Sequence, residues 1–185
     1  ALLEALARRG VDVVLSLEMF ERDVQPRLDD YLAGRIDEDE FLDGARPWSN
    51  YATDYRPLVE FARSQGWPVL AANVPRPLAA RVAREGLATL DTLETEAKPW
   101  IAREMHCPRD EYFERFAEAM GQHSVETQSA KEMEAMTWRF YEAQCVKDET
   151  MAESIAQALE SMPGRVIVHM NGSFHSDFGL GTVSR

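Results

Sequence analysis

The stretch Val13-Val14-Leu15-Ser16-Leu17, closed by Glu18, decides the fold of this chain. A near-continuous apolar run of this length is typical of a strand that is buried on both faces of a parallel sheet. We therefore predict a strand over residues 11–17. Two further segments, 68–73 and 165–170, have the same character and are predicted as the second and third strands.

The segments between these strands have helical patterns, and Gly or Pro punctuates them. Strands that alternate with helices predict an α/β fold, a layered sandwich with a mostly parallel sheet. Residues 1–185 form one predicted domain, and a helical insertion is expected at about 92–122 because two prolines interrupt the pattern there. Three strands are few for such a sheet. We therefore expect this domain to be truncated at both ends.

Composition excludes some partners. The formal net charge is −12, which argues against a nucleic acid, because phosphates require a basic face. An anionic ligand would need locally placed arginines. Cys107 and Cys145 are the two cysteines of the chain and lack CxxC spacing, so a disulfide and two free thiols both remain open. No apolar stretch reaches the about 20 residues that a membrane span requires.

Polar side chains stand where the predicted strands end. Glu18 follows the first strand, Asn73 ends the second, and His175 closes the motif Gly172-Ser173-Phe174-His175 after the third. Ligands of open parallel sheets bind beyond the carboxyl ends of the strands, so we expect these side chains to share one cleft.

A long helix is predicted from about residue 126 to 162, and its apolar stripe passes through Phe140, Met151 and Leu159. The same stripe places Gln144 and Asp148 on the inward face, where burying an amide and a carboxylate is costly unless both are hydrogen-bonded. They either cap a neighbouring strand or bind a core water, or they support the cleft at the strand ends.

Several catalytic motifs are missing from the sequence. It contains no HExxH, P-loop, GxGxxG or GxSxG pattern, which argues against nucleotide cofactors and a serine nucleophile.

Six motifs in order resemble the ChaN-like haem-binding proteins, in the superfamily that includes the Tiki metalloproteases and the erythromycin esterases. The resemblance covers nearly the whole chain. It rests on Leu17-Glu18-Met19-Phe20, Gln25, Trp48…Tyr51…Tyr55-Arg56-Pro57-Leu58, Ala72-Asn73-Val74-Pro75-Arg76, Ala143-Gln144…Asp148…Met151-Ala152 and Gly172-Ser173-Phe174-His175…Gly179.

The resemblance implies haem binding between two protomers, through a tyrosine ligand, in iron or haem acquisition. Tyr51 and Tyr55 are the candidate ligands, since phenolate binds ferric haem, and Arg56 or Arg76 would meet the propionates. The alternative is that both tyrosines pack a loop onto the sheet. The resemblance further implies a homodimer in the bacterial cell envelope. Membrane association would occur only through a lipid anchor that is not present in this chain. The residues themselves leave a cytoplasmic location open.

The family's opening strand carries a Gly-Glu-x-x-His motif that would precede Ala1. With it, Glu18 and His175 would suit a divalent metal and an activated water. A metal-dependent hydrolase of the Tiki or erythromycin esterase type is therefore the first alternative function. A binding domain without chemistry is the second.

Overall fold

A computed structural model describes residues 1–121 and 129–185. The chain divides into two compact units. The first comprises residues 1–73 and 153–172, and the second comprises residues 74–152 and 173–185. Within the described residues, no helix is both long and apolar enough to cross a membrane.

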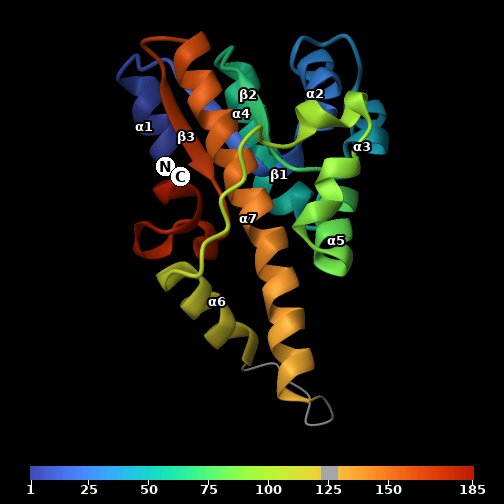
Figure 1. Ribbon diagram of the computed structural model, residues 1–185. Helices are drawn as coiled ribbons and strands as arrows, with labels where there is room; N and C mark the ends of the chain where they lie inside the picture. Colours follow the sequence, from blue (N-terminus) through green and yellow to red (C-terminus); the bar gives the residue numbers. More distant parts are fainter. Residues whose placement is uncertain (122–128) are drawn as a thin grey trace. The chain divides into compact units, whose positions relative to one another are not determined.

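The first unit contains a parallel sheet with the strand order β2-β1-β3. Strand β1 (Val13–Glu21) lies between β2 (Val69–Asn73) and β3 (Val166–Met170), as Figure 1 shows. Leu15 pairs with Val69 on one side and with Val168 on the other. The predicted α/β fold and its three strands are confirmed.

The predicted end of β1 is wrong. Glu18 does not close the strand but lies inside it, because Met19 and Phe20 continue the buried run and β1 ends at Glu21. The register with β2 shifts between Leu17 and Glu21, as at a β-bulge.

Burial on both faces holds for β1, whose nine residues are all buried, but not for β3. Val166 is 45% exposed and the rest of β3 is half-buried. β3 is an edge strand of this sheet, and an edge strand has a neighbour on one side only.

The outer edge of β2 is closed by a side chain. The Gln25 Nε2 donates to the Val69 carbonyl at 2.9 Å, and the Ala71 N–H donates to Gln25 Oε1 at 2.7 Å. One amide side chain thus pairs as a short extra strand would, and it satisfies backbone groups that burial would otherwise leave unpaired.

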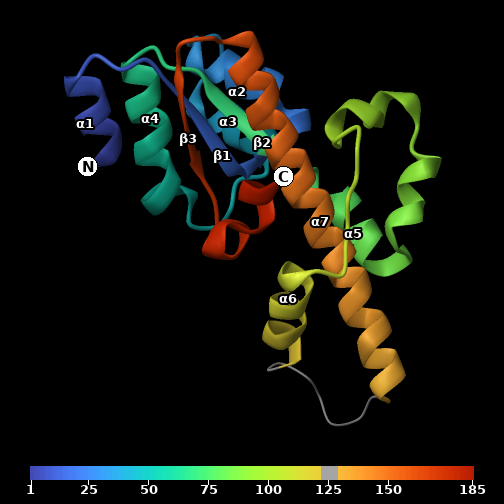
Figure 2. The same ribbon diagram turned by 60° about the vertical axis from the view of Figure 1, so that its left-hand side comes forward.

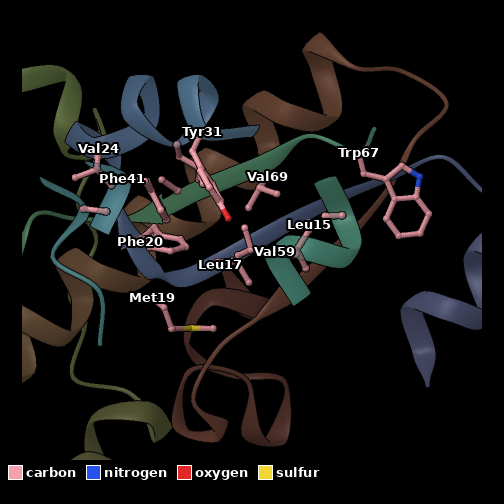
Figure 3. Close-up of a cluster of buried hydrophobic side chains, with 14 of the residues drawn as sticks. Leu15, Leu17, Met19, Phe20, Val24, Tyr31, Phe41, Val59, Trp67 and Val69 are labelled. Atoms are coloured by element: carbon pink, nitrogen blue, oxygen red, sulfur yellow. The ribbon is translucent and has the colours of Figure 1, made fainter. Parts of the chain in front are cut away.

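Four helices of the first unit pack their apolar side chains against the sheet (Figures 1 and 2). Figure 3 shows the centre of this core, where Tyr31 stacks on Phe41 with ring centroids 4.8 Å apart and Phe20 approaches Phe41 at 5.5 Å. The helices are α1 (Leu2–Arg8), α2 (Gln25–Leu32), α3 (Glu38–Ala45) and α4 (Arg56–Ser64). A π-helical turn, Tyr51–Tyr55, leads into α4.

The second unit is built from helices and 3-10 turns. Its helices are α5 (Arg76–Glu85), α6 (Glu111–Gly121) and the first part of α7 (Ala130–Ser161). Within the predicted insertion, a 3-10 turn at Thr95–Trp100 precedes α6. The predicted start of the long helix near residue 126 lies outside the described residues. Short 3-10 turns at Ser173–His175, Asp177–Gly179 and Gly181–Ser184 complete the unit.

A disulfide joins Cys107, before α6, to Cys145 on α7. It settles the question that the sequence left open. Around it, Tyr112 and Tyr141 form a second aromatic core with ring centroids 5.8 Å apart. The disulfide therefore links the segment before α6 to α7, beside the aromatic side chains that pack between the two helices.

Helix α7 follows its predicted stripe only in part. Gln144, Asp148 and Met151 are buried as expected, but Phe140 is 36% exposed and Leu159 is 54% exposed. An ideal helix drifts relative to a strict seven-residue repeat, so over 32 residues the buried face does not follow one line of the sequence.

Candidate functional site

In the first unit, the side chain of Glu18 is held by the turn that follows β3. Its Oε2 accepts the Gly172 N–H at 2.6 Å, a short distance typical of a bond to a charged group. The Glu18 carbonyl accepts the Asn73 Nδ2 at 3.0 Å. Both side chains are buried. The first unit therefore places the Asn73 side chain against the backbone of Glu18.

In the second unit, Asp148 is the centre of a buried polar cluster. Its Oδ2 accepts the Tyr112 hydroxyl at 2.8 Å, while Oδ1 accepts His175 Nδ1 and the Thr182 hydroxyl, each at 2.7 Å. Gln144 Nε2 donates to the Tyr112 oxygen at 3.0 Å. Side chains from α6 and from two C-terminal 3-10 turns thus converge on one fully buried carboxylate of α7.

The Asp148 contact fixes the tautomer of His175. A carboxylate only accepts hydrogen bonds when ionised, so His175 donates through its Nδ1–H. In the neutral ring, Nε2 then carries the lone pair, and the Gln144 Nε2 lies 3.4 Å from it. This arrangement orients the imidazole as a carboxylate orients a functional histidine.

Burial raises the pKa of the Tyr112 hydroxyl above its ordinary value, and the Asp148 charge acts in the same direction. Tyr112 therefore stays a neutral donor to Asp148. The sequence left open whether Gln144 and Asp148 cap a strand, bind a core water or support the cleft. In the structure, their hydrogen-bond partners are the side chains of Tyr112, His175 and Thr182.

The two candidate tyrosine ligands occupy different environments in the first unit. Tyr51 is 4% exposed between Phe20 and Phe41, and its hydroxyl has no hydrogen-bond partner among the described residues. Burial raises the pKa of Tyr51 well above its ordinary value. Tyr55 is half-buried and meets Trp48 edge-on, with ring centroids 5.9 Å apart.

The two candidate arginines also differ. Arg56, on the exposed start of α4, donates through Nε and Nη2 to the Glu38 carboxylate at 2.5 and 2.7 Å. This pairing raises the pKa of Arg56 and lowers that of Glu38. Arg76 is exposed at the first position of α5, in the second unit.

Comparison with known proteins identifies the family of this chain. The sequence matches the family model described as "Haem-binding uptake, Tiki superfamily, ChaN" over residues 1–185. The chain belongs to this family. A solved structure described as cofacial heme binding to ChaN of Campylobacter jejuni shares the fold, with a TM-score of 0.66 and 17% identity. The match covers 98% of this chain and spans 64% of the length of that one. The sequence matches none of the curated proteins with which it was compared.

The divalent metal predicted for this ChaN-family chain finds no support. Among residues 1–121 and 129–185, no group of three or more His, Cys, Asp or Glu side chains is arranged to hold a metal ion. Zinc sites use three or four protein ligands. The metal-dependent hydrolase alternative also relies on a Glu-x-x-His motif preceding Ala1, and it stays a prediction.

Sequence reasoning missed several residues of these two polar clusters. Tyr112 lies in the insertion and Thr182 follows the histidine motif, and neither position had a pattern that singled it out. Gly172 was quoted only as part of a motif, yet its N–H holds Glu18. Convergence of Glu18 and Asn73 with Gln144, Asp148 and His175 in one cleft stays a prediction.

Proposed function

We propose that this chain binds ferric haem and serves in haem or iron uptake. The observation that carries the proposal is the family match, which spans every residue of the chain and describes haem-binding uptake. The ChaN of Campylobacter jejuni, whose fold the chain shares, is described as binding heme cofacially.

Of the two candidate ligands, Tyr55 fits haem better. An axial phenolate must lose its proton and meet the iron at the surface of the unit. Tyr51 is enclosed by aromatic rings, and burial raises its pKa, so forming its phenolate in this conformation is costly. Tyr55 is half-buried on the π-helical turn, beside the indole of Trp48, an apolar surface suited to a macrocycle.

Arginines supply the positive charge that an anionic porphyrin needs. The chain has a net charge of −12, which repels the propionates at long range. Arg56 follows Tyr55 directly in sequence, and its planar guanidinium donates two hydrogen bonds to the Glu38 carboxylate. A propionate would take over the Glu38 contact with the same bidentate geometry.

The test is a titration of the whole chain with ferric haem, followed in the visible charge-transfer region. Tyr55→Phe should abolish the phenolate band and weaken binding by at least about tenfold, because one iron–ligand bond is lost. Tyr51→Phe is the matched control and should retain both band and affinity. Loss of the band in Tyr51→Phe alone would assign the ligand to Tyr51. Wild type that binds no haem would end the proposal.

We further propose that haem is held by a homodimer in the bacterial cell envelope, with membrane association through a lipid anchor outside this chain. The disulfide between Cys107 and Cys145 supports an oxidising compartment. Sedimentation with and without haem tests the dimer. Fractionation of the source bacterium tests the compartment, and recovery of the protein with the cytoplasmic fraction would contradict it.

A further inference from the structure

Asn171 is the one asparagine of this chain that precedes a glycine. Of the other two asparagines in the sequence, Asn50 precedes Tyr51 and Asn73 precedes Val74. Glycine is the most flexible residue and has no side chain to shield its nitrogen. An Asn-Gly bond is therefore the sequence in which a backbone nitrogen reaches the carbon of the preceding side-chain amide most easily, a reaction that makes asparagine a thermolabile residue.

The structure turns the Asn171 side chain toward Gly172. Its Nδ2 donates to the Gly172 carbonyl at 2.8 Å, so the side-chain amide lies along the residue whose nitrogen would attack it. Asn171 is half-buried and Gly172 is exposed, directly after the end of β3. The two groups that would react are therefore close together, at a bond that is open to solvent.

The fold does not require a glycine at position 172. Its φ lies outside the left-handed region, and a Cβ placed on Gly172 would meet Glu18 Oε2 at 3.6 Å, an ordinary van der Waals contact. Alanine would therefore fit at this position. It would also keep the contact with Glu18, which uses only the backbone N–H of Gly172.

The Glu18 carboxylate holds the nitrogen that the reaction needs. The Gly172 N–H donates to Glu18 Oε2 at 2.6 Å, and Glu18 is buried. The nitrogen attacks only after it has lost its proton, and a negative charge at this distance disfavours that loss about tenfold or more. The contact therefore slows the reaction at a bond whose sequence favours it.

We propose that Asn171 is a site of spontaneous deamidation and that Glu18 sets its rate. The Gly172 nitrogen gives its proton to the solvent and forms a bond to Asn171 Cγ. The bond between Cγ and Nδ2 then breaks, and Nδ2 takes up a proton and leaves as ammonia. Water opens the resulting cyclic succinimide at either carbonyl, which gives aspartate or isoaspartate without any oxidant or cofactor.

Either product weakens the contact that restrains the reaction. The new carboxylate stands next to the residue that Glu18 holds, and like charges repel. Isoaspartate also adds a methylene to the main chain between β3 and the turn Ser173–His175. Conversion therefore loosens this turn. The reaction uses no residue of the proposed haem site, so failure of either proposal leaves the other standing.

The test is incubation of the whole chain without haem at mildly alkaline pH, followed by peptide mass spectrometry of the three asparagines. Asn171 should convert faster than Asn50 and Asn73. Glu18→Gln keeps a hydrogen-bond acceptor but removes the charge, and it should raise the rate at Asn171 about tenfold. Equal rates in wild type and Glu18→Gln would overturn the role of Glu18. Faster conversion of Asn50 than of Asn171 in wild type would overturn the site.

Gly172→Ala is the matched control, because alanine fits at this position. It should lower conversion of Asn171 to the level of Asn50, both alone and combined with Glu18→Gln, and conversion at the wild-type rate would exclude the succinimide route. Circular dichroism checks that Glu18→Gln is folded. If it is not, wild type unfolded in urea serves as the state without the Glu18 contact, and it must convert at least about tenfold faster than native protein. The deamidated form, separated by anion exchange, should unfold at a lower urea concentration than the parent; an equal midpoint would overturn the loosening of the turn.

Discussion

Replacing Asp148 by Leu should destabilise the protein strongly. The carboxylate is fully buried and accepts three hydrogen bonds, from Tyr112, His175 and Thr182. Hydrogen bonds to a charged group contribute about 1.5–3 kcal/mol each. Relief of the desolvation of the carboxylate offsets part of that sum. Removing one member of a buried charged network typically costs about 3–5 kcal/mol, and we expect a loss in this range.

Asp148→Asn separates charge from shape. The amide oxygen can still accept from His175 and Thr182, whereas its NH₂ group faces the Tyr112 hydroxyl that formerly donated to Oδ2. One bond is reversed and the charge is lost, so we expect a cost of about 1–3 kcal/mol. The order of stability should be wild type, then Asn, then Leu.

Urea unfolding followed by circular dichroism measures these losses. A loss of about 3–5 kcal/mol corresponds to a decrease in Tm of about 6–20 °C for a chain of this size. Glu160→Leu is the control on the same helix, at an exposed position, and should stay within about 0.5 kcal/mol of wild type. A loss below about 1 kcal/mol for Asp148→Leu would refute the reasoning, because the three donors would then find equivalent partners elsewhere.

Three further predictions follow from the same physical arguments. Gln25→Ala should cost about 1–3 kcal/mol in urea unfolding, because it unpairs the β2 edge at Val69 and Ala71; Gln25→Glu, which sets a carboxylate oxygen against the Val69 carbonyl and the Asp29 carboxylate, should cost at least as much, and a variant as stable as wild type in either case would contradict the pairing. Reducing the Cys107–Cys145 disulfide, whose cysteines are 38 residues apart, should cost about 4 kcal/mol by chain entropy, and an unchanged urea midpoint in reductant would contradict it. Burial, with the hydrogen bond to Glu60, raises the pKa of Tyr31 from 10.0 to about 12. Its stabilising contribution is therefore full below pH 10 and is lost as pH rises toward about 12; if stability falls as steeply over this window in Tyr31→Phe as in wild type, Tyr31 is not the cause.

The sheet could be predicted from the sequence because burial and β-propensity agree there. In β1, apolar and β-branched residues occupy the same positions that the structure buries. The end of β1 could not be predicted, since Glu18 is polar yet remains within the strand, where the Gly172 N–H satisfies its side chain. That contact joins residues 154 positions apart, and no local pattern encodes it.

The Asp148 cluster was half predictable for a similar reason. Helical periodicity located Asp148 and Gln144 on the buried face of α7, because burial on a helix repeats with its turn. Their partners were not predictable. Tyr112 and Thr182 lie 36 and 34 residues from Asp148, and only the packing of α6 and the last 3-10 turn onto α7 makes them neighbours.

The choice between the two tyrosines shows where sequence reasoning ends and geometry decides. Tyr51 and Tyr55 are four positions apart, and in an α-helix residues at this spacing lie on one face. The structure forms a π-helical turn at Tyr51–Tyr55 instead, in which hydrogen bonds run to the fifth residue. One ring enters the aromatic core and the other stays half-buried. The burial of each ring, which the spacing in the sequence does not give, is therefore the physical difference on which the proposal of Tyr55 rests.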